Sequence, residues 1–375
     1  MGEAWIIDAV RTPRGKGKKE TGALSGIHPQ ALLAQCLVAL QSRNGFDPNH
    51  VEDLIAGCVS EVNDQAACIA RNAVLAAGWD ARSASGVTLN RFCGSGQQAV
   101  NFAAMGVMAG QQDLVIGGGV ESMSRVPMGS TGGGLDGNNP ELVALHPLVP
   151  QGISADLIAT LEGFTREDLD RFAAQSQERC AIAQKEDRFE KSLVPVRDPA
   201  GKVVLDRDEF PRAGTSAESL AKLAPSFEGL GAYVPKGDTR TLDQRALSRY
   251  TQISAIHHVH HAGNSSGIVD GAGAGHAALP RQSAHDDRRR RPHRDQRSLR
   301  RDPAEGDARP RYGPRQGERE RRRHRARPSA RRHRRDAARH RARRARAPGQ
   351  DHRSHHDVHR RRHGDRDDHR KGMTK

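Results

Sequence analysis

The sequence predicts a layered α/β domain followed by a basic segment of a different kind. Short apolar runs alternate with small-residue helical patterns over residues 1–119, and residues 120–249 are loop-rich and more charged. The apolar pattern resumes over 250–274, and the composition changes abruptly after it. We therefore expect an α/β core interrupted by an insertion, and a disordered Arg/His-rich tail over 275–375.

Charge and apolar content divide unevenly between these parts. The chain of 375 residues has a net charge of +15, but residues 281–375 alone hold 35 Lys and Arg against 14 Asp and Glu. Residues 1–280 keep 25 basic and 31 acidic side chains, so the core is mildly acidic and does not indicate a nucleic-acid binder. In 281–375 the large apolar side chains are only Leu299, Tyr312, Val358 and Met373. These are too few to bury a core that offsets chain entropy.

Hydrophobic periodicity predicts the elements of the core in order. Apolar runs predict strands, and Ala/Gly-rich runs with helical spacing predict helices. The predicted strands are 5–10, 54–56, 87–89 and 114–116, and the predicted helices are 28–40, 66–77, 94–109 and 167–185. We expect the first strand to be buried, because Trp5, Ile6 and Ile7 follow one another. The helix over 94–109 lacks charge, so we expect it to be covered on more than one side.

The cysteine pattern and the start of the chain indicate in which cellular compartment the protein resides. The five cysteines are Cys36, Cys58, Cys68, Cys93 and Cys180. Their number is odd and none forms a CxxC pair, which argues against a disulfide framework or a zinc-thiolate site. We find neither a signal peptide nor a stretch near 18 apolar residues, so we predict no membrane span and a cytoplasmic protein.

Cys93 is the strongest candidate for chemistry. It follows an apolar strand and precedes Gly94-Ser95-Gly96 and a helix, which is a strand–turn–helix elbow. The unpaired N–H groups and the dipole at a helix N-terminus stabilise a thiolate, and glycines let a substrate approach the backbone. The alternative is a small cysteine buried at a tight turn.

Four motifs place Cys93 in a wider pattern. They are Ile7-Asp8-Ala9-Val10-Arg11-Thr12-Pro13, Leu89-Asn90-Arg91-Phe92-Cys93-Gly94-Ser95-Gly96, Gly118-Gly119-Val120-Glu121-Ser122-Met123-Ser124, and Gly263-Asn264-Ser265-Ser266-Gly267 with Asp270-Gly271-Ala272. With these motifs in this order, residues 1–272 resemble the thiolases, the acyl-CoA C-acyltransferases. The details are most similar to the 3-ketoacyl-CoA thiolases of fatty-acid β-oxidation.

The resemblance implies a thiolase-like layered α/β/α fold and a set of roles. Cys93 would be the nucleophile that takes the acyl group as a thioester. Gly119 and Met123 would lie beside the active site, and Ser266 would contact CoA. The expected substrates are CoA thioesters, with no further cofactor and no metal. A homodimer or homotetramer is expected, with no membrane partner.

The same resemblance implies partners for Cys93 that the chain lacks. In this family an NEAF segment, a GHPLG histidine and a CxGGG cysteine supply the acid/base groups, and none of the three occurs here. A catalytically inactive fragment, in which 275–375 replaces the C-terminal thiolase domain, is therefore an alternative to the active enzyme.

Two further clusters have competing explanations. His257-His258-Val259-His260-His261 could place imidazoles on one strand face for a metal, but an ordinary strand-to-loop passage is favoured. The Gly-rich run 129–137 lacks a GxxxxGK pattern, so a phosphate loop is not predicted.

The basic tail has two interpretations. It could be an arm that binds nucleic acid by charge, although it lacks interleaved aromatics for base stacking. It could instead be the thiolase C-terminal half translated in a shifted frame. With a +1 shift, residues 327–335 permit GHPLGATGA and residues 357–362 permit an MCTGGG-type motif. We favour the shifted frame, and nucleic acid is not an expected partner.

Resequencing the gene across codons 265–375 tests this interpretation. We expect one base gained or lost near codon 273, with GHPLG and CxGGG motifs in the neighbouring frame. An unchanged frame would contradict it, and the chain would then lack the acid/base partners of Cys93.

Overall fold

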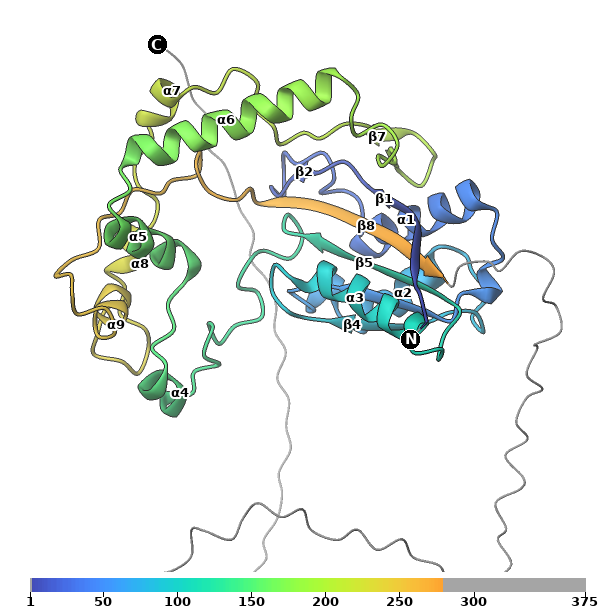
Figure 1. Ribbon diagram of the computed structural model, residues 1–375, viewed down its shortest axis with the longest axis horizontal. Helices are drawn as coiled ribbons and strands as arrows, with labels where there is room; N and C mark the ends of the chain where they lie inside the picture. The colour runs from blue at the N-terminus through green and yellow to red at the C-terminus, as the bar shows by residue number, and fades with distance from the viewer. Residues whose placement is uncertain (1, 279–375) are drawn as a thin grey trace, which may run out of the picture. The chain divides into compact units, whose positions relative to one another are not determined.

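The computed structural model describes residues 2–278, in which helices cover a six-stranded mixed sheet (Figure 1). The strands are β1 (Trp5–Arg11), β2 (Gly15–Lys16), β3 (Asp53–Gly57), β4 (Ser85–Leu89), β5 (Leu114–Ser122), β6 (Val196–Arg197), β7 (Val203–Leu205) and β8 (Val269–Ala278). The α-helices are α1 (Pro29–Asn44), α2 (Ile69–Ala76), α3 (Ser95–Met108), α4 (Pro140–Leu145), α5 (Gln151–Glu162), α6 (Arg166–Lys185), α7 (Ala217–Ala221), α8 (Glu228–Gly231) and α9 (Leu242–Leu247). Short 3-10 turns lie at Pro48–His50 and Asn63–Gln65.

The sheet order is β1-β8-β5-β3-β4, with β2 added beside β8. β3, β4 and β5 are parallel, whereas β8 runs antiparallel between β5 and β1. In register, Gly57 at the end of β3 lies opposite Leu89 of β4 and Gly119 of β5. The carboxyl ends of these three strands therefore meet at one edge, where Cys93 follows β4.

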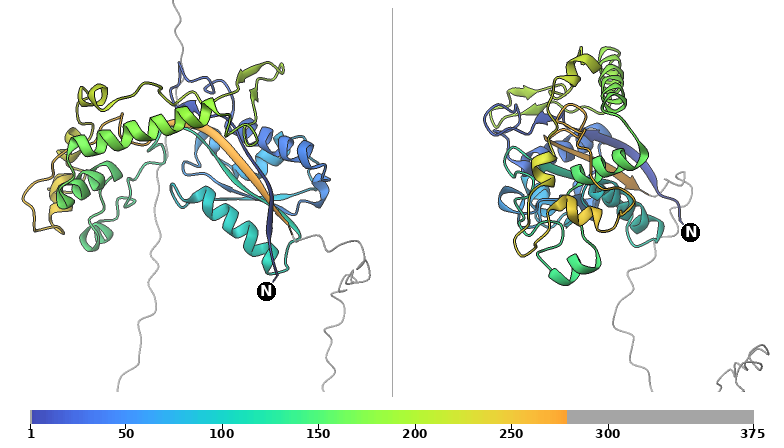
Figure 2. Two further views of the ribbon diagram at one scale, coloured as in Figure 1. Left: turned by 45° about the horizontal axis from the view of Figure 1, so that its top comes forward. Right: turned by 90° about the vertical axis from the view of Figure 1, so that its left-hand side faces the viewer.

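The two sheet faces pack against different helices, as Figure 2 shows. Leu54 and Ala56 of β3 join the cluster formed with α1 and α2, while Ile55 between them joins the α3 cluster. Alternate residues of a strand point to opposite faces, so one strand contributes to both layers. The result is the predicted layered α/β/α arrangement.

β5 is longer than the predicted strand 114–116, because it continues through Gly117, Gly118 and Gly119 to Ser122. A Cβ at Gly117 would lie 2.7 Å from the Val100 Cα in α3, and one at Gly118 would lie 2.3 Å from the Gly273 carbonyl oxygen. These glycines allow α3 and β8 to approach β5 closely. Because glycines have no side chains, residues 117–119 show no apolar pattern, and the strand was predicted to end too early.

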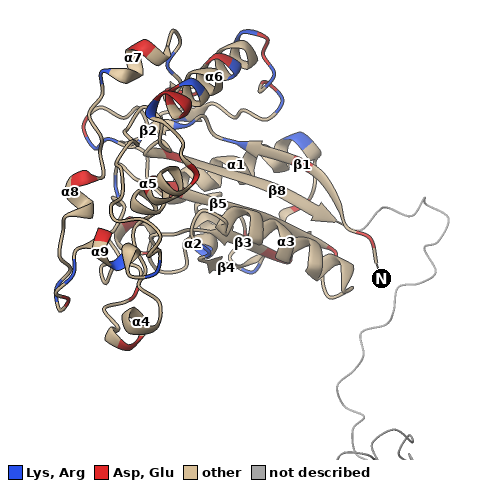
Figure 3. Ribbon diagram, turned by 60° about the vertical axis from the view of Figure 1, so that its left-hand side comes forward, with Lys and Arg blue, Asp and Glu red and all other residues tan. Residues whose placement is uncertain are grey.

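The prediction that β1 is buried is wrong for the first part of the strand, although Val10 near its end is buried. Trp5, Ile6 and Ile7 are 55%, 64% and 49% exposed. β1 is an edge strand of the sheet, and no helix within residues 2–278 covers these side chains. On α3, Phe102 and Met105 are exposed as well. Figure 3 shows α3 without Lys, Arg, Asp or Glu. Within the described part of the chain, α3 is thus packed on its sheet-facing side only.

Residues 123–268, between β5 and β8, form α4 to α9 and the β6–β7 pair, with α6 close to the predicted position. A small core of their own includes Ile153, Leu157, Leu242, Ala246 and Ile256. β8 runs to Ala278, past the expected core limit at 274, because its small Ala and Gly residues continue to pair with β5 and β1. The tail from 279 onward lies outside the described residues.

An ion pair joins the insertion to the end of β1. The Arg11 guanidinium donates both Nη1 and Nη2 to Asp208, at 2.7 and 2.9 Å, and the Arg14 backbone N–H donates to the same carboxylate at 2.8 Å. Burial raises the pKa of Asp208, but these donors outweigh burial and hold the pKa below its usual range. The bidentate geometry makes this one of the stronger kinds of charged contact.

Asp208→Asn should lower the free energy of unfolding by about 2 kcal/mol, because it leaves the Arg11 charge without its carboxylate. Because the folded pKa of Asp208 is depressed, its stabilisation is present above about pH 3.9 and lost as the pH falls through the folded value. Urea unfolding at several pH values measures both effects. Asp206→Asn, at an exposed carboxylate two residues away, is the control. Equal loss in the two variants would contradict the assigned role.

Candidate active site

Cys93 lies in a strained elbow between β4 and α3. Phe92, just before it, has φ 48° in the left-handed region, and Gly94 caps the helix. Two side chains hold this turn. Asn90 Oδ1 accepts from the Phe92 N–H at 2.8 Å, and Ser95 Oγ accepts from the Arg91 N–H at 2.8 Å while donating to the Phe92 carbonyl at 2.6 Å. Such strain costs on the order of 1–3 kcal/mol and persists where neighbouring contacts over-determine the conformation.

The elbow rests directly on the end of β3. A Cβ at Gly57 would lie 2.5 Å from the Ser95 carbonyl carbon, and one at Gly119 would lie 2.6 Å from the Gly57 carbonyl oxygen. Backbone therefore packs on backbone here, and only glycine fits at either position. The start of α3 is fixed against the sheet by this contact.

A hollow of about 720 Å³ opens beside the elbow. Its lining includes Cys93, Gly119, Met123 and Ser266, so the fold gathers the four predicted site residues from three separate stretches of the chain. Most of the other lining residues are glycine, alanine or larger apolar residues, among them Gly96, Gly117, Val120 and Ala272. The lining is therefore largely apolar, and its glycines allow a bound molecule to approach the backbone closely.

Exposure separates Cys93 from the other cysteines. All five are free, and Cys93 is exposed whereas Cys36 and Cys58 are buried. Burial raises the pKa of the Cys36 thiol to about 12, and burial with the nearby charges of Glu121 and Glu61 raises that of Cys58 to about 12. Cys58 also lines the hollow, but it is a neutral thiol at physiological pH. Cys93, at the N-terminus of α3, is the cysteine suited to nucleophilic attack.

Two carboxylates beside the hollow hold the backbone in place. Glu121 accepts from the backbone N–H groups of Val59 and Ser60, at 2.7 and 3.2 Å, and from Gln65 Nε2 at 2.8 Å. Asp270 is fully buried and accepts from the Ser124 N–H at 2.8 Å. Burial raises the pKa of Asp270 despite this bond.

These two residues were not identified as site residues from the sequence. Both lie inside the motifs that carry the family resemblance, so motif membership was the available signal. Asp270 ties the turn that holds Met123 to β8, and Glu121 ties β5 to the loop after β3. Both carboxylate oxygens of Glu121 accept hydrogen bonds, whereas Asp270 is fully buried and its Oδ2 has no hydrogen-bond partner within the described residues.

The histidine cluster faces carboxylates. His258 and His260 contact Asp156, and His261 contacts Asp170. Among residues 2–278 there is no group of three or more His, Cys, Asp or Glu arranged to hold a metal ion. Hydrogen bonds to aspartates therefore explain the positions of these imidazoles without a metal ion.

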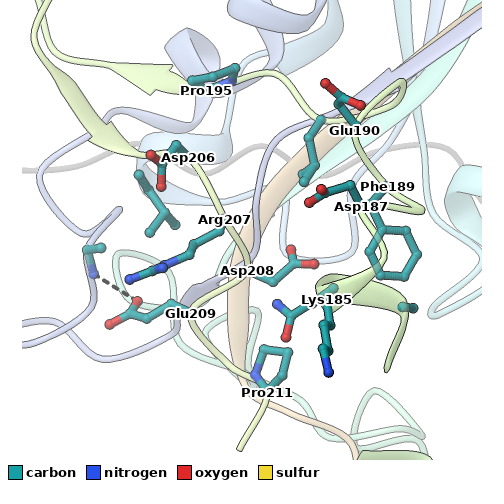
Figure 4. A pocket seen from close by; sticks show the side chains of 15 residues that line it. Lys185, Asp187, Phe189, Glu190, Pro195, Asp206, Arg207, Asp208, Glu209 and Pro211 are labelled. Carbon is teal, nitrogen blue, oxygen red and sulfur yellow. Dashed lines mark hydrogen bonds between the residues drawn. The ribbon is translucent and has the colours of Figure 1, made fainter. Parts of the chain in front are cut away.

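A second hollow, of about 930 Å³, lies between the end of α6 and the 205–211 segment (Figure 4). It shares no lining residue with the Cys93 hollow and contains several carboxylates. Asp208 is paired with Arg11, and Glu209 accepts the backbone N–H groups of Lys16 and Ala23. These two carboxylates fasten the insertion to the β1–β2 region, and the hollow holds no cysteine.

Comparison with known proteins agrees with this geometry. The family model described as the thiolase N-terminal domain matches residues 4–242. The chain belongs to the thiolase family. It is 39% identical over 239 residues to the steroid 3-ketoacyl-CoA thiolase of Mycobacterium tuberculosis, covering 61% of this chain and 57% of that protein. It is 37% identical over 259 residues to the 3-ketoacyl-CoA thiolase of Shewanella frigidimarina, covering 66% and 63%.

A third thiolase relative and a crystal structure extend the comparison. The β-ketoadipyl-CoA thiolase of Acinetobacter baylyi is 36% identical over 293 residues, covering 73% of this chain and 65% of that protein. The acetyl-CoA acetyltransferase of Bacillus anthracis superimposes with a TM-score of 0.56 at 29% identity, covering 74% and 66%. The thiolase chain described here thus spans about three fifths of the length of its curated relatives. None of the helices described is long and apolar enough to cross a membrane.

Alkylation with iodoacetamide near pH 7 should label Cys93 first. A thiol pKa of about 12 leaves Cys36 and Cys58 with about a thousandfold less thiolate than an ordinary cysteine, so these two should react only on unfolding. Peptide mapping by mass spectrometry measures the order of labelling. Cys93→Ser is the matched control, and early labelling of Cys58 would contradict the structure.

Proposed function

We propose that this chain carries out the acyl-transfer chemistry of a thiolase, with Cys93 as the nucleophile. One observation carries the proposal: an exposed cysteine at the N-terminus of α3 opens into a glycine-rich hollow that also holds Gly119, Met123 and Ser266. A CoA thioester can bring its carbonyl close to backbone there because no side chains intervene at the glycines.

The chemistry follows from the properties of sulfur. The Cys93 thiolate attacks the thioester carbonyl, the bond from that carbon to the CoA sulfur breaks, and CoA leaves as a thiolate that takes up a proton. One thioester replaces another, so the step is close to balanced in free energy, and cysteine is a better nucleophile near neutral pH than serine. No cofactor beyond the CoA thioester is needed for this step.

The finer assignments belong to the same proposal. The relatives named as 3-ketoacyl-CoA thiolases support thiolytic cleavage of 3-ketoacyl-CoA, or the reverse condensation, in fatty-acid β-oxidation. Gly119 and Met123 would border the acyl group, and Ser266 would contact CoA. We further propose a cytoplasmic homodimer or homotetramer.

Turnover needs more than the nucleophile. A full cycle requires a base for the first thiol and an acid/base for the α-carbon, and the GHPLG and CxGGG motifs that supply them in this family are absent from the sequence. We therefore expect Cys93 to accept an acyl group but to release it slowly.

Incubating the full chain with acetyl-CoA tests the proposal. Intact-mass spectrometry should show one added acetyl group, mapped to Cys93, with release of one equivalent of CoA and little further turnover. Cys93→Ser should abolish the addition, and Cys180→Ser should preserve it. Acylation that survives in Cys93→Ser would overturn the assignment, and an unmodified Cys93 would favour the inactive fragment.

A further inference from the structure

His258 bridges two carboxylates from different helices. Its Nδ1 lies 2.7 Å from Asp156 Oδ2 in α5, and its Nε2 lies 2.9 Å from Asp243 Oδ2 in α9. A neutral imidazole has one donor and one acceptor, so it can satisfy only one of these carboxylates. Both hydrogen bonds form only when His258 is an imidazolium.

The other histidines of the cluster do not require charge. His260 approaches a carboxylate with one nitrogen only, as Nδ1 lies 2.7 Å from Asp156. His261 has Nε2 at 2.8 Å from Asp170, while its Nδ1 accepts the Gly263 N–H at 3.0 Å. A neutral tautomer satisfies each of them, which singles out His258.

Two aspartates anchor the segment that contains these histidines. Asp156, fully buried, also accepts the backbone N–H groups of Val259 and His260, each at 3.0 Å. Asp170 in α6 accepts Asn264 Nδ2 at 2.9 Å. Residues 258–264 are thus tied to α5 and α6, and His258 adds the link to α9.

The charges around His258 set its protonation. The titratable groups that face it are Asp156 from α5, Asp243 from α9, and His260 of its own segment through their shared aspartate. Burial lowers the pKa of His258, but the hydrogen bonds and charges of Asp243 and Asp156 outweigh burial and raise it. The pKa of Asp156 is held low by its donors in spite of burial.

The anchored segment leads directly into the Cys93 hollow. Ser266 and Gly267 follow it and line that hollow. A Cβ at Gly267 would lie 2.4 Å from the Phe210 ring, so this ring packs closely against the stretch. A change in the anchored segment is therefore transmitted along a few residues to the side of the hollow formed by Ser266.

We propose that His258 is a positioning residue for the CoA-thioester site: as an imidazolium it clamps residues 258–264 between α5 and α9 and holds Ser266 in place. Deprotonation removes one of the two hydrogen bonds and loosens the segment. The clamp itself is independent of the proposed function, whereas its effect on CoA-thioester binding rests on that function.

Amide hydrogen exchange of the full chain tests the clamp. Because the folded pKa of His258 is raised, protection of the Val259 and His260 amides should be complete below about pH 6.5 and fall as the pH rises through the folded value. We expect at least a tenfold loss of protection, after correction for the intrinsic pH dependence of exchange. His258→Gln should be less protected at low pH and show no step.

Two variants make the test specific. His257→Gln changes an exposed neighbour in the same segment and should keep the wild-type step. Asp243→Asn leaves Asp156 in place and should move the step to lower pH. A wild-type chain without a step, or a step that survives in His258→Gln, would overturn the clamp. If His258→Gln does not fold, Asp243→Asn still tests the clamp, because a step that stays at the wild-type pH in this variant would overturn it.

A binding measurement separates positioning from stability. The acetyl-CoA concentration for half-maximal acylation of Cys93 should rise with pH in the wild-type chain and in His257→Gln, following the exchange step. The maximal acylation rate, taken relative to the rate of Cys93 alkylation by iodoacetamide at the same pH, should show no change at the pH of the exchange step. An exchange step without the affinity change would refute the positioning role. Absence of acylation in every variant would refute the proposed function and leave the clamp to the exchange result.

Discussion

Close backbone packing at the ends of the strands is the constraint on which the site depends. The start of α3 packs directly on Gly57, and Gly119 lies against Gly57. The middle of α3 packs directly on Gly117. Any side chain at these positions would push the helix away from the sheet, and Cys93 would move with it. The strained conformation at Phe92 is maintained by this contact and by the hydrogen bonds of Asn90 and Ser95.

The sequence was sufficient to locate Cys93 within the fold but not to predict what surrounds it. A strand, a Cys-Gly-Ser-Gly turn and an uncharged helix are local patterns, and they placed Cys93 where the structure has it. Ser266 could be associated with Cys93 only through the family resemblance, because no local pattern joins stretches so distant. The pairing of His258 with Asp156 spans 102 residues and has no periodic signal.

Burial was the least predictable property. Trp5, Ile6 and Ile7 have the composition of a core strand, but burial depends on what packs against the strand, and within residues 2–278 their side chains stay exposed. The glycines of β5 gave the opposite error, since residues without side chains give no hydrophobic pattern even at the centre of a sheet. Both errors have the same cause, because a hydrophobic pattern depends on the side chains of a segment and not on the elements that pack against it.

The position of β8 has a consequence for how the domain comes to be folded. This strand is the last described element in sequence, yet it separates β1 from β5 in the middle of the sheet. During synthesis β1 has no partner strand within the sheet until β8 has left the ribosome, more than 250 residues later. A protein cut before residue 269 would retain β3, β4 and β5 but lose the strand that joins them to β1, so nascent chains of that length depend on chaperones or on rapid completion to avoid aggregation.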